Sequence, residues 1–388
     1  MAIRSDVYGY LVPRLRNHPL LWKVAKEVHS LPGLARHSAA HYVPQLIGPQ
    51  PRKLHLAVTA YCNLRCIGCR YGRDFMPNSQ LELPMVRDLL DDAKAVGVET
   101  ARLYGGEPLL HRDLPKMVEH SVALGLRTYV TTNGILLKEK IDDLYNAGLR
   151  EISIGFYGVG GEYDQYVQRP AQFDRLERGV AYLRQRYGRK VQVHLNWLLM
   201  RPSCNMVALG QAYDFAERYD LSLRVDLVHY SLPYFTEGPD RVLQFRPEDQ
   251  RQIELVVSEL IRLKQERPER ISDTLRHLRS IPDWLLKGPD MRVPCDAYRL
   301  LWVGADGTTQ LCYVTFRLGN LHETRLRDMM FTHTHRQAAR DAYALNCPNC
   351  HCDASDRINK DFSSRLKYGT RQQFETGSHG SPIAVEPA

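Results

Sequence analysis

Three cysteines lie within eight positions of one another, at Cys62, Cys66 and Cys69. Thiolates bind zinc and iron–sulfur clusters, and two cysteines separated by two residues can also act as a redox pair. A structural zinc site requires four ligands, and the next cysteine or histidine along the chain is His111. A redox pair of Cys66 and Cys69 leaves Cys62 without a function. A [4Fe–4S] cluster held by three thiolates uses all three and leaves one iron open, so the spacing favours this site.

A second group of cysteines lies in the C-terminal quarter of the chain, at Cys295, Cys312, Cys347, Cys350 and Cys352. Nine cysteines in a chain without a recognisable secretion signal favour metal ligands or catalytic thiols over a disulfide framework. A structural zinc site built from two cysteine pairs is one interpretation of the second group. Cys204 lies apart from both groups, and an isolated cysteine most often packs in the core.

The elements that must position these residues follow from an alternation of apolar and amphipathic segments. Short apolar runs cover residues 54–59, 101–105, 127–132, 151–156, 191–200 and 223–230. The segments between them have helical periodicity, and several end at a glycine, as helices commonly do. Six strand–helix units predict an α/β fold with a parallel sheet, either open or partly closed into a barrel. In both arrangements the active site lies at the C-terminal ends of the strands.

Polar residues and glycines gather at these expected strand ends. They are Gly105, Gly106, Glu107 and Pro108 after the second strand, Thr132 and Asn133 at the third, Ser153 and Asn196 in the fourth and fifth, and Asp226, His229 and Tyr230 at the sixth. Because the ends of parallel strands meet at one edge of a sheet, we expect these residues to form one site with the cysteine loop.

Together these features resemble the radical S-adenosylmethionine (SAM) superfamily. Its CxxxCxxC signature matches Cys62, Cys66 and Cys69, and the sequences GGEP at 105–108 and TTNG at 131–134 match further motifs. The resemblance covers roughly residues 52–230 and implies a partial (β/α)6 barrel, similar to a TIM barrel. It also implies that the three cysteines hold a [4Fe–4S] cluster whose open iron binds the amino and carboxylate groups of SAM.

The resemblance implies further contacts to SAM from the strand ends. The GGEP residues Gly105, Gly106, Glu107 and Pro108 would support its amino group, and Thr132, Asn133, Ser153 and Asn196 would hold its carboxylate or ribose.

One position departs from the family pattern. The aromatic residue that usually precedes the third cysteine is replaced by Gly68. Two interpretations stay open: Tyr71 supplies a contact to the adenine, or Gly68 permits a tight turn around the cluster.

The second cysteine group resembles the SPASM/Twitch extensions of radical SAM enzymes. Its first two cysteines flank an expected hairpin with a DG turn at 306–307, and the others begin after a gap of 34 residues. The resemblance implies the shorter Twitch form, with one auxiliary [4Fe–4S] cluster on Cys295, Cys312, Cys347 and Cys350. Cys352 is then spare, although it could replace one of its two nearest neighbours in this set.

The resemblance implies reductive cleavage of SAM to a 5′-deoxyadenosyl radical that abstracts a hydrogen atom from the substrate. We expect a net dehydrogenation or an epimerisation of a small sugar-like or cyclitol-like molecule, with the auxiliary cluster accepting an electron. Asp226, His229 and Tyr230 are candidates for substrate contacts or for a catalytic base, and they could equally be polar residues that only line the mouth of the barrel. In an epimerisation, Cys352 or Cys204 could return a hydrogen atom to the substrate. The alternatives are a peptide-modifying maturase and an enzyme acting on a lipid-linked or polyprenyl-linked substrate.

Composition limits the location and the partners. The 388 residues carry a net charge of +8, spread along the chain without a nucleic-acid-binding motif, so no nucleic acid is expected. There is no uninterrupted apolar segment of membrane-spanning length, and we predict a cytoplasmic enzyme that receives electrons from flavodoxin or ferredoxin. The basic, amphipathic N-terminal segment is expected to pack on the main domain or to contact a membrane surface.

The pattern divides the chain into five parts. We predict a helical extension over 1–52, the radical SAM barrel over 53–235, a helical connector over 236–290, the auxiliary-cluster domain over 291–365, and a disordered tail over 366–388.

Overall fold

The structure is a computed structural model that describes residues 31–71, 75–229, 238–313 and 315–369. Tyr230 and the N-terminal residues 1–30, on which the predicted membrane contact depends, lie outside the described residues. Of the predicted N-terminal extension, residues 31–39 are helical. None of the described helices is both long and apolar enough to cross a membrane.

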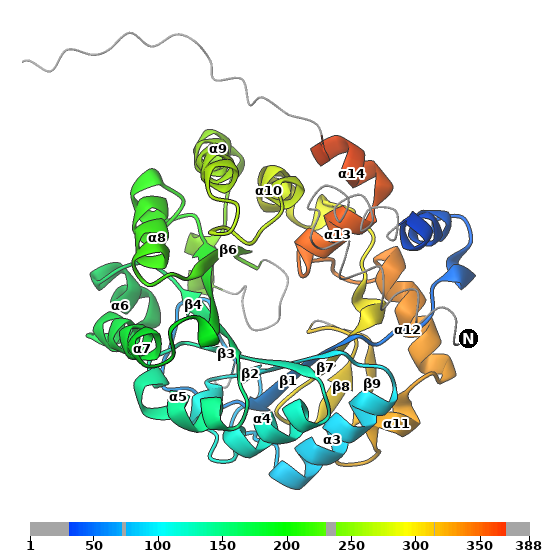
Figure 1. Ribbon diagram of the computed structural model, residues 1–388. Coiled ribbons are helices and arrows are strands. Elements are labelled where there is room, and N and C mark those ends of the chain that lie inside the picture. The colour runs from blue at the N-terminus through cyan, green and yellow to red at the C-terminus, as the bar shows by residue number, and fades with distance from the viewer. Residues whose placement is uncertain (1–30, 72–74, 230–237, 314, 370–388) are drawn as a thin grey trace, which may run out of the picture.

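A curved sheet forms the centre of the molecule, and six of its strands are the predicted ones (Figure 1). These strands are β1 (Lys53–Thr59), β2 (Thr100–Gly105), β3 (Arg127–Thr132), β4 (Glu151–Phe156), β5 (Gln192–Leu199) and β6 (Ser222–Leu227). They pair in parallel in the order β6-β5-β4-β3-β2-β1. The predicted α/β fold with an unclosed, TIM-like parallel sheet is therefore confirmed.

Helices cover the outer side of this sheet (Figure 1). They are α3 (Leu83–Ala95), α4 (Leu114–Ala123), α5 (Leu137–Asn146), α6 (Gly161–Val167), α7 (Gln172–Tyr187) and α8 (Met206–Arg218). Each is amphipathic and buries its apolar side in the core, as Val86, Leu89 and Leu90 of α3 do. Strands β1 and β4 are mostly buried, whereas in β3 and β6 buried residues alternate with more accessible ones.

The C-terminal part begins with two helices, α9 (Gln250–Glu266) and α10 (Leu275–Lys287). The predicted hairpin follows as β7 (Leu300–Val303) and β8 (Thr308–Gln310), which pair antiparallel, and β9 (Arg317–Asn320) pairs antiparallel with β8. Because β7 pairs in parallel with β1, the C-terminal strands extend the sheet of the barrel to nine strands and do not form a separate sheet.

Four more helices complete this part: α11 (Leu326–Met329), α12 (His333–Ala344), α13 (Ala354–Lys360) and α14 (Phe362–Gly369). In Figure 1, α10 and α13 lie across the central space from strands β1–β3. The expectation that the disordered tail starts at residue 366 is wrong, because α14 continues to Gly369. Arg279 donates to the carbonyl oxygens of Tyr368 and Gly369, which anchors this helix end.

Candidate active site

A cavity of about 340 Å³ lies inside the curved sheet, at the side of the cysteine loop. Most of the predicted site residues line it: Cys62, Cys66, Cys69, Tyr71, Gly105, Gly106, Thr132, Asn133, Asn196, Asp226, His229 and Cys352. Glu107, Pro108 and Ser153 are buried and are not among its lining residues. The structure therefore brings the strand ends and the first cysteine group together around one space.

The cysteine loop is held against the end of α6. The amide of Ile67 donates to the carbonyl oxygen of Tyr166 at 2.8 Å, and the amide of Arg65 donates to that of Val167 at 3.3 Å. From the other side, the Asn133 side-chain amide donates to Asn63 Oδ1 at 2.8 Å. These contacts fix the loop so that its three thiols face the cavity.

Gly105 and Gly106 allow the end of β2 to touch the backbone at the start of this loop. The Gly106 amide donates to the carbonyl oxygen of Thr59, and the Glu107 amide donates to that of Tyr61, both at 2.8 Å. A Cβ atom on Gly105 would lie 2.1 Å from the Thr59 oxygen, and one on Gly106 would lie 2.4 Å from the Tyr61 oxygen. Any larger residue would therefore displace the backbone that leads into the cysteines.

The Glu107 carboxylate connects two strand ends behind the cavity wall. It is fully buried and accepts hydrogen bonds from Thr132 Oγ1 at 2.7 Å, the Asn133 amide at 2.8 Å and the Leu109 amide at 3.0 Å. Burial raises the pKa of Glu107 to about 7, although these hydrogen bonds oppose the shift. In this structure Glu107 binds the neighbouring strand and supports the position of Asn133.

Asn196 offers an acceptor at the cavity. Its side-chain amide donates to Ser153 Oγ at 2.6 Å, whereas its Oδ1 atom is buried and has no hydrogen-bond partner among the described residues. A buried acceptor without a hydrogen-bond partner costs free energy. The Asn196 Oδ1 atom is therefore suited to accept a hydrogen bond from an N–H or O–H group of a ligand. The amino group and ribose hydroxyls of SAM are such donors.

The departure at Gly68 has a conformational reason. Its φ angle is +82°, in the left-handed region that side chains other than glycine rarely adopt. An aromatic residue at this position would be strained, which agrees with the tight-turn interpretation. Tyr71 lies on the cavity wall, but its ring is largely buried beside Phe75 and its hydroxyl faces Met76 Sδ at 3.5 Å.

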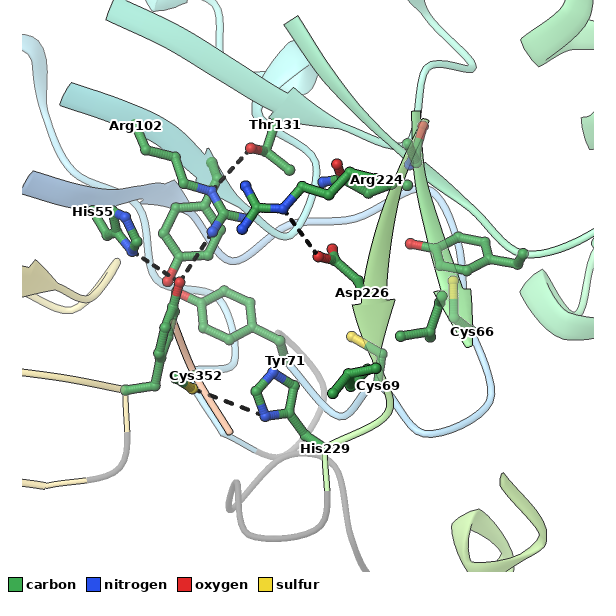
Figure 2. A pocket seen from close by; sticks show the side chains of 18 of the residues that line it. His55, Cys66, Cys69, Tyr71, Arg102, Thr131, Arg224, Asp226, His229 and Cys352 are labelled. Carbon is green, nitrogen blue, oxygen red and sulfur yellow. Dashed lines mark hydrogen bonds and ion pairs between the residues drawn. The ribbon is translucent and has the colours of Figure 1, made fainter. Parts of the chain in front are cut away.

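The strand-six residues Asp226 and His229 line the same cavity as the cysteine loop (Figure 2). Asp226 lies 3.8 Å from Arg224 Nε, and burial raises the pKa of its carboxyl group. His229 stacks on His351 with ring centroids 4.6 Å apart, and its Nδ1 lies 3.9 Å from Cys352 Sγ. Burial lowers the pKa of His229 to about 4, with Arg102 adding to the shift, so the ring is neutral at pH 7.

Sequence reasoning missed two charged residues on the cavity wall, Arg102 of β2 and Arg224 of β6. The strand alternation could have found them. Arg102 lies two residues before Tyr104, and Arg224 two residues before Asp226, so each shares a strand face with a residue of the cavity.

The second cysteine group lines a separate, smaller cavity. All four predicted ligands (Cys295, Cys312, Cys347 and Cys350) lie on its wall together with Cys352. Cys352 lines both cavities, whereas Cys204 is buried in the core and lines neither. Within the described part of the chain, no three His, Cys, Asp or Glu side chains converge as ligands of a single metal ion.

Arg357 holds the loop that carries the last three cysteines. It is fully buried, and its guanidinium group donates to the carbonyl oxygens of Val293 and Cys350 and to Asn349 Oδ1 at 3.2 Å. Arg357 also lines the second cavity, so a positive charge lies beside the thiols. Five thiols and one cation match the ligands and the negative charge of a thiolate-bound cluster.

Residues 56–202 match the family model of the Radical SAM superfamily. This part of the chain is therefore a radical SAM domain, which implies a [4Fe–4S] cluster and SAM as cofactors. Three thiols on one cavity wall, beside the unpaired acceptor of Asn196, fit both groups.

Among curated proteins, the chain is similar to the AdoMet-dependent heme synthase of Methanosarcina barkeri, with 31% identity over 137 residues. It is also similar to the GTP 3′,8-cyclase of Chlorobaculum tepidum, with 30% identity over 173 residues. These matches cover 34% and 44% of this chain, and the chain spans only 39% and 52% of the two relatives.

Two solved structures share the fold over more than three quarters of the chain. One is anSMEcpe with bound AdoMet, with a TM-score of 0.58 and 16% identity, covering 76% of this chain and 83% of the other. The second is SuiB of Streptococcus suis bound to the precursor peptide SuiA, with a TM-score of 0.60 and 17% identity, covering 79% and 70%. The likeness extends beyond the radical SAM domain, and at these identities it concerns the fold alone.

Proposed function

We propose that this protein is a radical SAM enzyme that removes a hydrogen atom from a small organic substrate. One observation carries the proposal: a single cavity is lined both by Cys62, Cys66 and Cys69 and by residues of strands β2, β3 and β5 and their ends. When bound to these thiols, the cluster supplies the electron that cleaves SAM to methionine and the 5′-deoxyadenosyl radical, which abstracts the hydrogen atom. The protein's own contribution is to bind and orient the substrate and to exclude water.

We infer that Cys295, Cys312, Cys347 and Cys350 hold an auxiliary [4Fe–4S] cluster, and that the reaction is a net dehydrogenation. The substrate then loses one hydrogen atom to the radical, one proton to a base, and one electron to the auxiliary cluster. Neutral His229, which lines the substrate cavity, is the candidate for the base. The shared wall at Cys352 supports this assignment, because it brings the second cysteine group next to the substrate.

Epimerisation is the second outcome that these residues support. Cys352 would return a hydrogen atom to the substrate radical, and its thiyl radical would then be reduced by one electron and one proton. Cys204 is not suited to this step, because it is buried in the core away from the cavity. The expected substrate is a sugar-like or cyclitol-like molecule, and the expected electron donor is a cytoplasmic flavodoxin or ferredoxin.

Modification of a peptide is a second candidate function. It is favoured by one observation: SuiB, which shares the fold, is described with a bound precursor peptide. The third candidate, a lipid-linked substrate, was inferred from N-terminal residues that lie outside the described part of the chain and stays a prediction.

Anaerobic reconstitution tests the proposal. Two clusters correspond to about eight irons per chain, and a variant with Cys62, Cys66 and Cys69 all changed to alanine is expected to keep about four and to produce no 5′-deoxyadenosine. Cys204→Ala is the matched control and is expected to keep both properties. Bound zinc without iron, or iron without formation of 5′-deoxyadenosine under strong reduction, would contradict the proposal. Transfer of deuterium from labelled sugars, cyclitols or peptides into 5′-deoxyadenosine then separates the substrate classes.

A further inference from the structure

Arg102 places a positive charge on the cavity wall without an ion-pair partner among the residues that the structure describes. Its Nε atom donates to Thr131 Oγ1 at 2.9 Å, and Nη1 donates to the Tyr313 hydroxyl at 3.0 Å. The guanidinium group also lies over the Tyr104 ring, 4.6 Å from its centroid. Within the described residues no carboxylate forms an ion pair with Arg102, so its neighbours there are hydroxyl groups and a ring. Burying a charged guanidinium group among such neighbours costs free energy unless an anion binds to it.

Arg224 points into the same space from the opposite part of the sheet (Figure 2). Half of its side-chain surface, 50%, remains accessible although the residue lies inside the barrel, because that surface faces the cavity. Its ion pair with Asp226 is long, with 3.8 Å between Nε and Oδ1, which exceeds hydrogen-bond distance. Arg224 therefore retains N–H donors for a ligand.

The other charged residues around the cavity have partners of their own. Asp353 lines the cavity and pairs with Lys53 at 3.3 Å, and Lys53 also binds Asp356 at 2.6 Å. Asp273 accepts the Val225 amide at 2.8 Å. The cavity-lining histidines His55 and His277 have a lowered pKa because of burial. Among the described residues that line the cavity, Arg102 and Arg224 are the two with a permanent positive charge, and Asp226 and Asp353 are the two carboxylates.

Arg102 lies further into the barrel than the strand ends that face the cysteine loop. It precedes Gly105, the last residue of β2, by three residues, which corresponds to roughly 10 Å along a strand. Its side chain reaches toward those ends, because its Nε atom donates to Thr131 Oγ1, next to Thr132 on β3. An anion that binds Arg102 in protein already holding SAM is therefore a group of the substrate.

We propose that the substrate carries an oxyanion group, a carboxylate or a phosphate, which Arg102 and Arg224 bind at the floor of the cavity. Guanidinium groups bind both oxyanions through paired N–H donors, and the hydroxyls of Thr131 and Tyr313 hold Arg102 in place for this contact. The inference rests on the proposed function, because it names a property of that enzyme's substrate. Tyr313 directly follows Cys312, so the same contact links the substrate to the second cysteine group.

The test uses the full chain, reconstituted anaerobically with SAM and without reductant, in isothermal titrations. The probes are benzoate, phenyl phosphate and the neutral benzamide, which has nearly the shape of benzoate. We expect at least one anion to bind tenfold or more tightly than benzamide, and Arg102→Gln and Arg224→Gln each to weaken that binding at least tenfold. Arg127→Gln is the matched control, because Arg127 lies on neighbouring β3 with its guanidinium group bound to Glu151 at 2.8 Å, outside the cavity lining.

Equal binding of benzamide, absence of binding by both anions, or unchanged affinity in both arginine variants would overturn the inference. The comparison of benzoate with benzamide on the unaltered protein decides the question even where a variant does not fold. The stronger of the two anions identifies the group as carboxylate or phosphate. Because no reductant is present, the titration measures anion binding without SAM cleavage. Anion binding tests the inference about the substrate and SAM cleavage tests the proposed function, so each can fail without the other.

Discussion

Replacing Gly106 by alanine tests whether the close backbone contact at the end of β2 supports the first cluster. The new Cβ atom would lie 2.4 Å from the Tyr61 oxygen and 2.6 Å from the Ala60 oxygen, where contacts below 3.0 Å essentially do not occur. The two backbones must therefore separate by about 0.6 Å, which stretches two hydrogen bonds of 2.8 Å to roughly 3.4 Å. Losing two hydrogen bonds costs about 2 kcal/mol, or roughly a 30-fold lower ratio of ordered to disordered cysteine loop.

We expect the rate of 5′-deoxyadenosine formation in Gly106→Ala to fall more than threefold and by up to this factor, while the irons of the auxiliary cluster remain bound. Gly210→Ala is the control, because a Cβ atom on Gly210 in helix α8 meets nothing within 4 Å. A Gly106→Ala enzyme that keeps its full iron content and cleaves SAM within threefold of the original rate would refute the reasoning.

Three further predictions follow from the buried groups. Burial raises the pKa of Glu107 from 4.5 to about 7 in the folded protein, so Glu107 contributes most to stability below pH 4.5, and this contribution is lost as the pH rises to 7. The shift is worth about 3 kcal/mol, and the free energy of unfolding, measured relative to Glu107→Gln, should fall by this amount over that range. A difference between the two proteins that does not change with pH would contradict the prediction. Arg357→Met leaves the buried carbonyl oxygens of Val293 and Cys350 unpaired and should destabilise the protein by about 3 kcal/mol, with loss of about four irons per chain, measured by denaturant unfolding and iron assay. Cys350→Ala should lose the auxiliary irons, whereas Cys352→Ala should keep them and form the same dehydrogenated product; a loss of hydrogen return in Cys352→Ala, measured by deuterium incorporation, would instead support epimerisation, and equal iron loss in both variants would make Cys352 a ligand.

The strands and the first cysteine site could be predicted because their signals are local. The parallel strands begin and end within two residues of the apolar runs, or three at the end of β6, because the side of each strand that packs against the helices must be apolar. The strand-end residues meet at one cavity because parallel strands end at one edge of a sheet. The tail boundary was misjudged because the anchors of α14, such as Arg279, lie some 90 residues away in the sequence.

The sequence by itself determined the spacing of the thiols, the alternation of strands and helices, and the glycines that bring β2 against the cysteine loop. Only the tertiary structure decided that β7 pairs with β1, that Cys352 lies between the two cavities beside His229, and that Tyr313 binds Arg102. These pairs are separated by more than 100 residues, so no local pattern encodes them. They arise because β7 joins the sheet beside β1 and α13 packs on α10 across the open side of the sheet, which places Cys352 on the wall of the larger cavity.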